Sequence, residues 1–232
     1  KSVNIPSGVI TIEDDAFYNN DLTRVTIPST VTKIGHGAFS VNKLEYVMIP
    51  SSVTKIGNYA FDWEDLVLIE LQTNDNFVIE NNLLMNHDKK ILIAGIGKLN
   101  KISIPFGLRT IEHGAFYSNE LTSVTIPSSV TKIGNGAFSE NQLTSVTIPF
   151  GVKTIGDYAF SYNEIKTVTI PPTVNWVGDY AFEQNRLQGV AIDYRVTKLG
   201  KSVFFEKRKI GKMVYESDYD ERGYHKRTYY DY

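Results

Sequence analysis

The chain has 232 residues, of which 42% are hydrophobic and 22% charged, a composition typical of a globular protein with a substantial core. A formal net charge of −2 gives no general electrostatic reason to expect nucleic acid or an anionic membrane as partner, and no apolar run approaches the roughly 20 residues that span a bilayer. The absence of cysteine excludes disulfide bonds, thiolate catalysis and cysteine-ligated zinc. Because Lys1 already stands inside the repeat pattern, we expect a mature or trimmed piece of a longer protein.

A repeat of 22 residues organises most of the chain. An Ala-Phe pair recurs at this spacing in two series, and a proline that follows Thr-Ile or a related pair recurs with it. A period of this length is typical of solenoids and lies within the leucine-rich-repeat range, so we expect one elongated stack of repeats. The phenylalanines are Phe17, Phe39 and Phe61 in the first series and Phe116, Phe138, Phe160, Phe182 and Phe204 in the second, the last preceded by valine.

Each repeat is predicted to contain two extended segments and a bend. Residues 121–126 follow the spacing L-x-x-L-x-L and alternate apolar with polar side chains, which predicts a strand with one buried face. Pro127 cannot donate to a sheet and ends that strand. A second, shorter extended segment follows over residues 130–133. The Ala137-Phe138 pair is then expected on one short helical or 3-10 turn.

An asparagine occupies the next bend in six of the repeats. When repeats stack, these amides lie above one another and can satisfy backbone groups of the bend. We therefore interpret them as structural. They are Asn20, Asn42, Asn119, Asn141, Asn163 and Asn185.

These units resemble the BspA-like class of leucine-rich repeats, in which IPxxVxxIGxxAF is followed by a polar bend and LxxIxIP. The resemblance extends from Lys1 to about Phe204 and is carried by units such as IPSSVTKIGNGAFSENQLTSVTIP. Many family members have cysteine in the bend and a unit of about 23 residues, whereas this chain is an asparagine-bearing variant of 22. The resemblance implies a surface-exposed or secreted bacterial protein that binds host or neighbouring-cell proteins.

The outward positions of the main strand change character in the third and fourth repeats. Elsewhere they hold serine and threonine, but here apolar, aromatic and acidic side chains replace them. Apolar residues at solvent-facing positions indicate an interaction patch, and Trp and Tyr are typical anchors. The alternative is that a neighbouring hairpin covers the patch. The candidate residues are Glu45, Tyr46, Met48, Trp63, Val67, Leu68 and Glu70, with Glu64 and Asp65 beside the tryptophan.

The regular pattern is then interrupted by a long repeat at about residues 72–98. Its segments FVIENNLLMN and KILIAG flank HDKK and predict a β-hairpin, a feature that BspA-like proteins often carry. One interpretation is that Leu83, Leu84, Ile91 and Ile93 cover the side of the solenoid. The other is a protruding hairpin that makes contacts.

A column of basic residues accompanies the second extended segment. Lys33, Lys55, Lys132 and Lys198 share one position, with Arg109 and Lys153 one residue away. Stacking would align them into a basic stripe for an acidic partner or glycan. Copying of the repeat explains them more simply, and lysine on a sheet also discourages edge pairing.

The last segment, residues 205–232, breaks the register and is rich in charge and tyrosine. We predict a hairpin that caps the final apolar repeat, as solenoids require. A tyrosine-rich contact surface is the alternative.

No pattern indicates catalysis. His36, His87, His113 and His225 do not belong to one motif, and metalloprotease, nucleophile-elbow and phosphate-loop signatures are missing. We expect neither an enzyme nor a cofactor or metal.

Taken together, the sequence predicts a leucine-rich-repeat solenoid of the α/β horseshoe class over residues 1–204, β-dominated with short helical turns, followed by a cap. Its expected role is non-catalytic protein binding on a bacterial surface or in a secreted protein, in adhesion or host interaction. A structural spacer that presents another domain is the second hypothesis.

Overall fold

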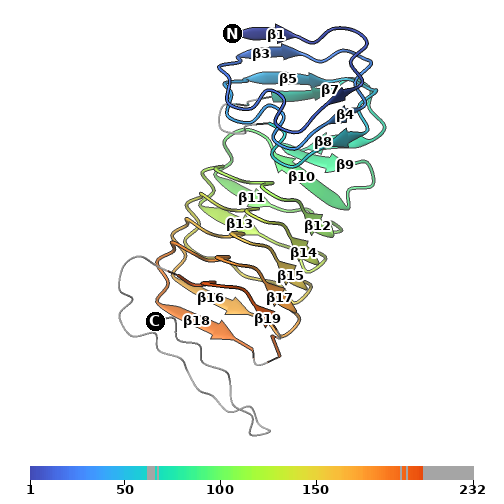
Figure 1. Cartoon of the computed structure of the whole chain (residues 1–232). Coiled ribbons are helices and arrows are strands. Elements are labelled where there is room, and N and C mark those ends of the chain that lie inside the picture. Colours follow the sequence, from blue (N-terminus) through green and yellow to red (C-terminus); the bar gives the residue numbers. More distant parts are fainter. Residues whose placement is uncertain (62–65, 67, 194, 197, 206–232) are drawn as a thin grey trace, which may run out of the picture.

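A computed structural model describes residues 1–61, 66, 68–193, 195–196 and 198–205. They form a solenoid of stacked repeats, each running once around a common interior (Figure 1). Among these residues every regular element is a β-strand. None of them forms a helix of the length and apolarity needed to cross a membrane.

One side of the solenoid carries the main strands, which pair in parallel at a register of 22 residues. In β1 and β3, for example, Val3 lies opposite Val25. The pairs are β1–β3, β5–β7, β11–β13 and β16–β18. Their bounds are β1 Ser2–Asn4, β3 Arg24–Thr26, β5 Tyr46–Ile49, β7 Leu68–Leu71, β11 Lys101–Ser103, β13 Ser123–Thr125, β16 Thr167–Ile170 and β18 Gly189–Ile192.

The second side carries two-residue strands from the shorter extended segments. Those before the long repeat form a three-stranded sheet, β2-β4-β6, and those after it belong to an eight-stranded sheet. The strands are β2 Thr11–Ile12, β4 Lys33–Ile34, β6 Lys55–Ile56, β12 Thr110–Ile111, β14 Lys132–Ile133, β15 Thr154–Ile155, β17 Trp176–Val177 and β19 Lys198–Leu199.

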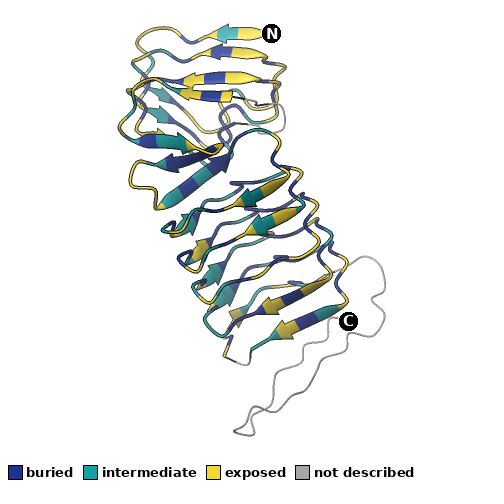
Figure 2. Cartoon of the chain, turned by 180° about the vertical axis from the view of Figure 1, so that it is seen from behind, coloured by how far each residue is buried: buried dark blue, intermediate teal, exposed yellow. Residues whose placement is uncertain are grey.

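Phenylalanine rings stack along the interior. Phe17, Phe39 and Phe61 lie with ring centroids 5.2 and 5.6 Å apart and nearly parallel planes. The second series, from Phe116 to Phe204, repeats this at 5.1–5.7 Å. All of these rings except the terminal Phe17 and Phe204 are buried almost completely, so they contribute much of the apolar core of each repeat. Buried and exposed residues alternate along several of the main strands, as the colours of Figure 2 show.

The bend at Ala137-Phe138, where a short helical or 3-10 turn is expected, is a hydrogen-bonded turn that does not continue into a helix. The Ala137 N–H donates to Gly134 O within the bend, but the Phe138 N–H donates to Ala159 O of the next repeat, at 2.8 Å. An α-helix would need that N–H for its own i−4 carbonyl. Bonding between repeats therefore takes the place of helix formation at this bend.

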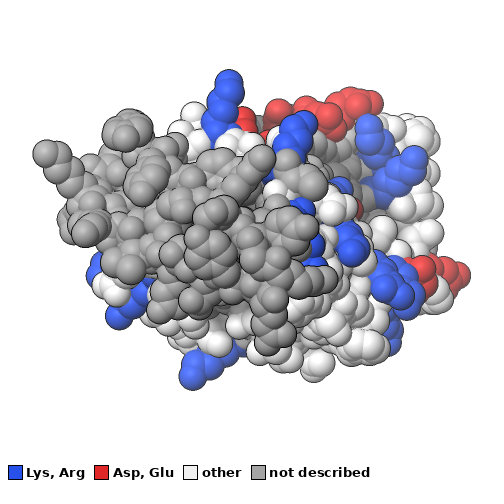
Figure 3. All heavy atoms as spheres, turned by 90° about the horizontal axis from the view of Figure 1, so that it is seen from below, with Lys and Arg blue, Asp and Glu red and all other residues white. Residues whose placement is uncertain are grey.

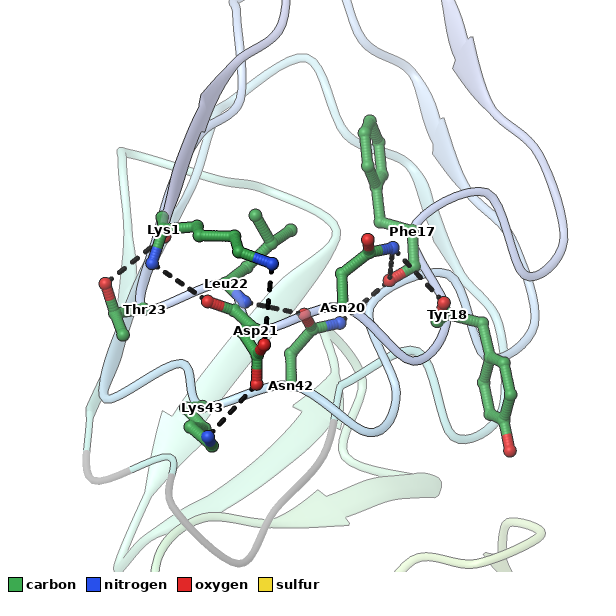
Figure 4. A network of polar contacts seen from close by, with 9 residues as sticks. All are labelled: Lys1, Phe17, Tyr18, Asn20, Asp21, Leu22, Thr23, Asn42 and Lys43. Atoms are coloured by element: carbon green, nitrogen blue, oxygen red, sulfur yellow. Dashed lines mark hydrogen bonds and ion pairs between the residues drawn. The ribbon is translucent and has the colours of Figure 1, made fainter.

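The asparagines bind backbone groups of their own repeat and of the one before. Asn163 Nδ2 donates to Phe138 O at 2.8 Å and Phe160 O at 3.2 Å, while its Oδ1 accepts from the Leu143 N–H at 2.9 Å. Asn42 does the same near the N-terminus, joining Phe17 O to the Leu22 N–H (Figure 4). The amides of Asn42, Asn141, Asn163 and Asn185 thus each tie two repeats together, which agrees with the structural role expected for these residues.

The long repeat contains three antiparallel strands, β8 Phe77–Glu80, β9 Leu83–Asn86 and β10 Ile91–Gly95. β10 pairs in parallel with β12, so all three extend the eight-stranded sheet. The Asn86 carboxamide closes the β9–β10 turn, accepting from the N–H groups of Lys90 and Ile91 at 2.9 and 2.8 Å. These strands lie between the two series of repeats (Figure 1).

The long repeat also joins two hydrophobic cores. Leu83, Met85 and Leu92 pack with the phenylalanines that follow them, whereas Leu84 and Ala94 pack with those that precede them. Leu83 and Leu84 are both fully buried. β9 therefore has core on both faces, so it acts as the layer between two stacks.

Two side chains mark the point where the regular ladder is broken. Tyr59 reaches across the long repeat, and its hydroxyl donates to Asn135 O at 3.1 Å. Asn119 is 1% exposed, yet its Nδ2 and Oδ1 have no hydrogen-bond partner among the described residues. The repeat before it lacks the bend that the other asparagines bind.

The fit of Tyr59 depends on glycine. Gly114 has a φ of +64°, and a Cβ there would overlap the Tyr59 ring. We expect Gly114→Ala to lower the free energy of unfolding by about 2 kcal/mol or more, through both left-handed strain and the clash. Gly189→Ala is the matched control, because its Cβ would meet only Thr167 Cγ2 at 3.9 Å. Urea unfolding checks this, and equal midpoints for the two variants would contradict it.

The asparagines provide a second test. Asn163→Leu leaves the buried Leu143 N–H without its acceptor, so we expect a loss of about 2–3 kcal/mol. Asn119→Leu removes an amide that has no partner among the described residues and should cost less than about 1 kcal/mol. Thermal unfolding of both variants measures the difference. Equal destabilisation would show that the hydrogen bonds of Asn163 are not what stabilises its bend.

Candidate interaction surface

The third and fourth main strands bring several of the predicted residues together. β5 and β7 pair so that Tyr46 lies opposite Leu68 and Met48 opposite Glu70. Tyr46, Met48 and Leu68 are 36%, 43% and 47% exposed. We call the side chains of Tyr46, Met48, Leu68 and Glu70 the β5–β7 face. Glu45 is exposed beside it, whereas Trp63, Glu64, Asp65 and Val67 lie outside the described residues.

Strand alternation explains why these side chains face outward. Val47 and Ile49 of β5 are fully buried, and Ile69 of β7 is nearly so. Successive side chains point to opposite faces of a strand, so the residues between them must face solvent. In β16 the corresponding outward positions are Thr167 and Thr169.

A hydrogen bond links the two strands on the β5–β7 face. The Tyr46 hydroxyl donates to Glu70 Oε2 at 2.8 Å. This bond to a carboxylate stabilises the protonated phenol and raises the pKa of Tyr46, with smaller contributions from desolvation and the negative charge of Glu70. The aromatic ring is thereby held against a fixed neighbour without being buried.

Among the described residues, those of the long repeat do not cover the β5–β7 face. The strands of the long repeat continue the sheet of short strands through β12, on the second side of the solenoid. Leu83 and Leu84 are fully buried, while Ile91 and Ile93 are half-buried. These apolar residues of the long repeat thus lie in the core or on the side of the solenoid that carries the short strands. Tyr46, Met48 and Leu68 stay exposed.

Two exposed phenylalanines were missed by sequence reasoning. Phe106 and Phe150 are 82% and 70% exposed and occupy one position, two repeats apart, directly after the proline of the main strand. The repeat between them has Ser128 there. Phe150 also borders a pocket of about 530 Å³ lined by outward residues of β16 and β18. Comparing this position across repeats, as was done for Tyr46, would have found both.

The lysine column does not form one continuous stripe. Lys33 and Lys55 are in register on β4 and β6, but Lys132 lies between Thr110 and Thr154. The ammonium of Lys198 lies 4.5 Å from the centre of the Trp176 ring in the neighbouring strand. Viewed end-on, lysine and arginine side chains occupy several sides of the stack (Figure 3). The long repeat and the intervening Thr and Trp residues interrupt the column.

His36 and His113 lie near each other. His36 contacts Tyr59 edge-on at 5.6 Å, and burial lowers the pKa of His113, with the charges of Lys132 and His36 adding to the effect. Within that part, no group of three or more His, Asp or Glu side chains is placed to hold a metal ion. His225 and all but the first residue of the cap predicted over residues 205–232 lie outside the described residues.

The sequence matches a family model for the BspA type leucine rich repeat region, in six copies over residues 1–94 and 90–211. The chain belongs to the BspA-type leucine-rich repeat family. No curated protein matches it.

Solved structures share the fold of this BspA-type chain. A leucine rich cell surface protein from Faecalibacterium prausnitzii is 30% identical, with a TM-score of 0.82 over 94% of this chain and 60% of the other. The pneumococcal vaccine antigen PcpA has a TM-score of 0.76 at 21% identity, over 90% of this chain and 57% of the other. A leucine-rich repeat protein from Eubacterium ventriosum is 22% identical and has a TM-score of 0.54, over 96% of this chain and 86% of the other. The chain thus spans less than two thirds of the first two.

The Tyr46–Glu70 contact is open to direct measurement. Glu70→Ala removes the carboxylate that stabilises the protonated phenol, so we expect the pKa of Tyr46 to fall toward its ordinary value. Glu45→Ala, on the exposed neighbour, should leave it unchanged. An NMR pH titration of the Tyr46 ring checks both. The same Tyr46 pKa in Glu70→Ala and in the unaltered protein would contradict the geometry.

Proposed function

We propose that this BspA-type chain is a protein-binding module of a bacterial surface or secreted protein, acting in adhesion or host interaction through the β5–β7 face. Three large apolar side chains exposed on two paired strands are the observation that carries the proposal. The family and the cell surface protein of similar fold support its setting.

The mechanism is recognition by a preformed surface. The paired strands and the buried Val47, Ile49 and Ile69 hold the outward side chains in place before a partner arrives. Binding then requires little ordering of the backbone, which preserves more of the contact energy as affinity. Tyr46 is the natural anchor, since it combines a large ring with a polar tip already fixed by Glu70.

A variant that restores the ordinary repeat tests this surface. Tyr46→Ser, Met48→Thr and Leu68→Thr together give the face the character of the other main strands. Because even one buried anchor contributes about 2 kcal/mol or more, we expect affinity for the partner to fall by at least about 30-fold. Affinity capture from host serum and epithelial extracts, identification by mass spectrometry and titration of the purified partner measure the effect.

The control is Thr167→Ala with Thr169→Ala, at the corresponding outward positions of β16. A partner kept by the unaltered protein and by this control, but lost by the β5–β7 variant, supports the proposal. Retention of the same proteins by all three, or of none, would contradict it and favour a spacer that presents another domain.

A further inference from the structure

A second site lies at the bends that follow the short strands. At one position of these bends the backbone is left-handed in successive repeats: φ is +57° at Gly37, +54° at Tyr59, +64° at Gly114, +58° at Gly136 and +55° at Tyr158. Glycine adopts this conformation readily and has no side chain to fill the surface. Gly114 and Gly136, in neighbouring repeats, therefore leave room for the Tyr59 side chain, whose ring lies against Gly114 and whose hydroxyl lies against Gly136.

Tyr59 fills the space over both glycines and forms one wall of a pocket beside it. Its ring lies over Gly114, its hydroxyl donates to Asn135 O, and Tyr117 contacts it edge-on at 5.9 Å. Tyr158 forms another wall, stacked on Tyr180 with ring centroids 5.1 Å apart. Both walls are thus fixed by packing against further rings.

Between these walls is a pocket of about 360 Å³. Tyr59, Tyr117, Tyr158 and Tyr162 line it, and the last two are 43% and 50% exposed. Such a volume is at the lower end for small-ligand sites, which suits one side chain. The aromatic faces carry the negative side of a ring quadrupole, which attracts cations.

The charged side chains that line the pocket are all acidic. Glu140 and Asp157 line it, and no lysine or arginine does so among the described residues. Tyr117 donates to Glu140 Oε1 at 2.7 Å, and Asp157 Oδ1 accepts from the Asp179 N–H at 2.8 Å, so both carboxylates have fixed positions. Burial first, then the negative groups nearby, raises the pKa of Tyr158, which agrees with an electronegative surface.

We propose that this pocket binds the guanidinium of an arginine side chain on a partner protein. A guanidinium is planar, stacks on aromatic rings and pairs with carboxylates, and it is less strongly hydrated than an ammonium. Tyrosine walls and two carboxylates offer both kinds of contact. The site lies on the bends and not on the main strands, so the proposal does not depend on the β5–β7 face.

The test is an NMR titration of the 232-residue chain with Nα-acetyl-arginine amide. We expect shifts in the amides of Gly136, Ser139 and Ser161, which border the pocket. The neutral isostere Nα-acetyl-citrulline amide should bind about tenfold more weakly or not at all, since it lacks the charge that cation–π and ion-pair contacts require. Tetramethylammonium, a small cation that is not planar and has no N–H donors, should also bind more weakly than the arginine probe.

Substitutions within the pocket provide the matched variants. The double variant Asp157→Asn with Glu140→Gln removes both charges but keeps side-chain oxygens that can accept the same hydrogen bonds. An asparagine already fills this role one repeat earlier, where Asn135 Oδ1 accepts from the Asp157 N–H. We expect a loss of affinity for the arginine probe of about tenfold. Asp14→Asn is the control, because Asp14 accepts from the His36 N–H at the same position of a repeat in the first series.

Three results would overturn the proposal. These are equal binding of arginine and citrulline probes, tighter binding of tetramethylammonium than of arginine, or unchanged affinity in the Asp157/Glu140 variant. The triple variant of the β5–β7 face, with Tyr46→Ser, Met48→Thr and Leu68→Thr, should bind the arginine probe normally. A failure of one site is therefore distinguishable from a failure of the other.

Discussion

The fold depends on one constraint, the register of 22 residues between neighbouring parallel repeats. Neighbouring repeats exchange backbone hydrogen bonds, as the Gly134 N–H does with Ile111 O and the Phe138 N–H with Ala159 O. Since the sequence has the same period, equivalent inward side chains of neighbouring repeats meet. Phenylalanine stacks on phenylalanine, and asparagine binds the bend of the preceding repeat. A shift of one residue would separate all these pairs at once, which is why the register is strongly specified.

The long repeat shows how the stack accommodates a break in this register. Without its own Ala-Phe bend, it replaces one short strand by three antiparallel strands and buries leucines on both faces of β9. Tyr59 bridges the gap on one edge, and among the described residues the Asn119 amide is left without the partner that its equivalents have. The break is compensated mainly by packing, and only partly by hydrogen bonds.

A regular interior leaves the outward positions free to vary. Because inward residues satisfy the core, replacement of threonine by Tyr46, Met48 or Leu68 changes the surface without changing the strand. The same holds at the bends, where glycine or tyrosine can occupy a left-handed position. Binding sites in this protein are therefore substitutions on a fixed frame, and they are found by asking where a column stops repeating.

The amino-acid sequence by itself determined the solenoid, the period, the inward strand residues and the structural role of the asparagines, because each depends on a local pattern repeated along the chain. It also pointed to the outward residues of β5 and β7, since alternation decides which side chains leave the core. Only the tertiary structure decided where the long repeat lies, that the Ala-Phe bend is not helical, and that Tyr59 meets Gly114 and Asn135. These depend on contacts between distant repeats, such as the one that joins Tyr59 to Asn135 across 76 residues, and no local pattern encodes them.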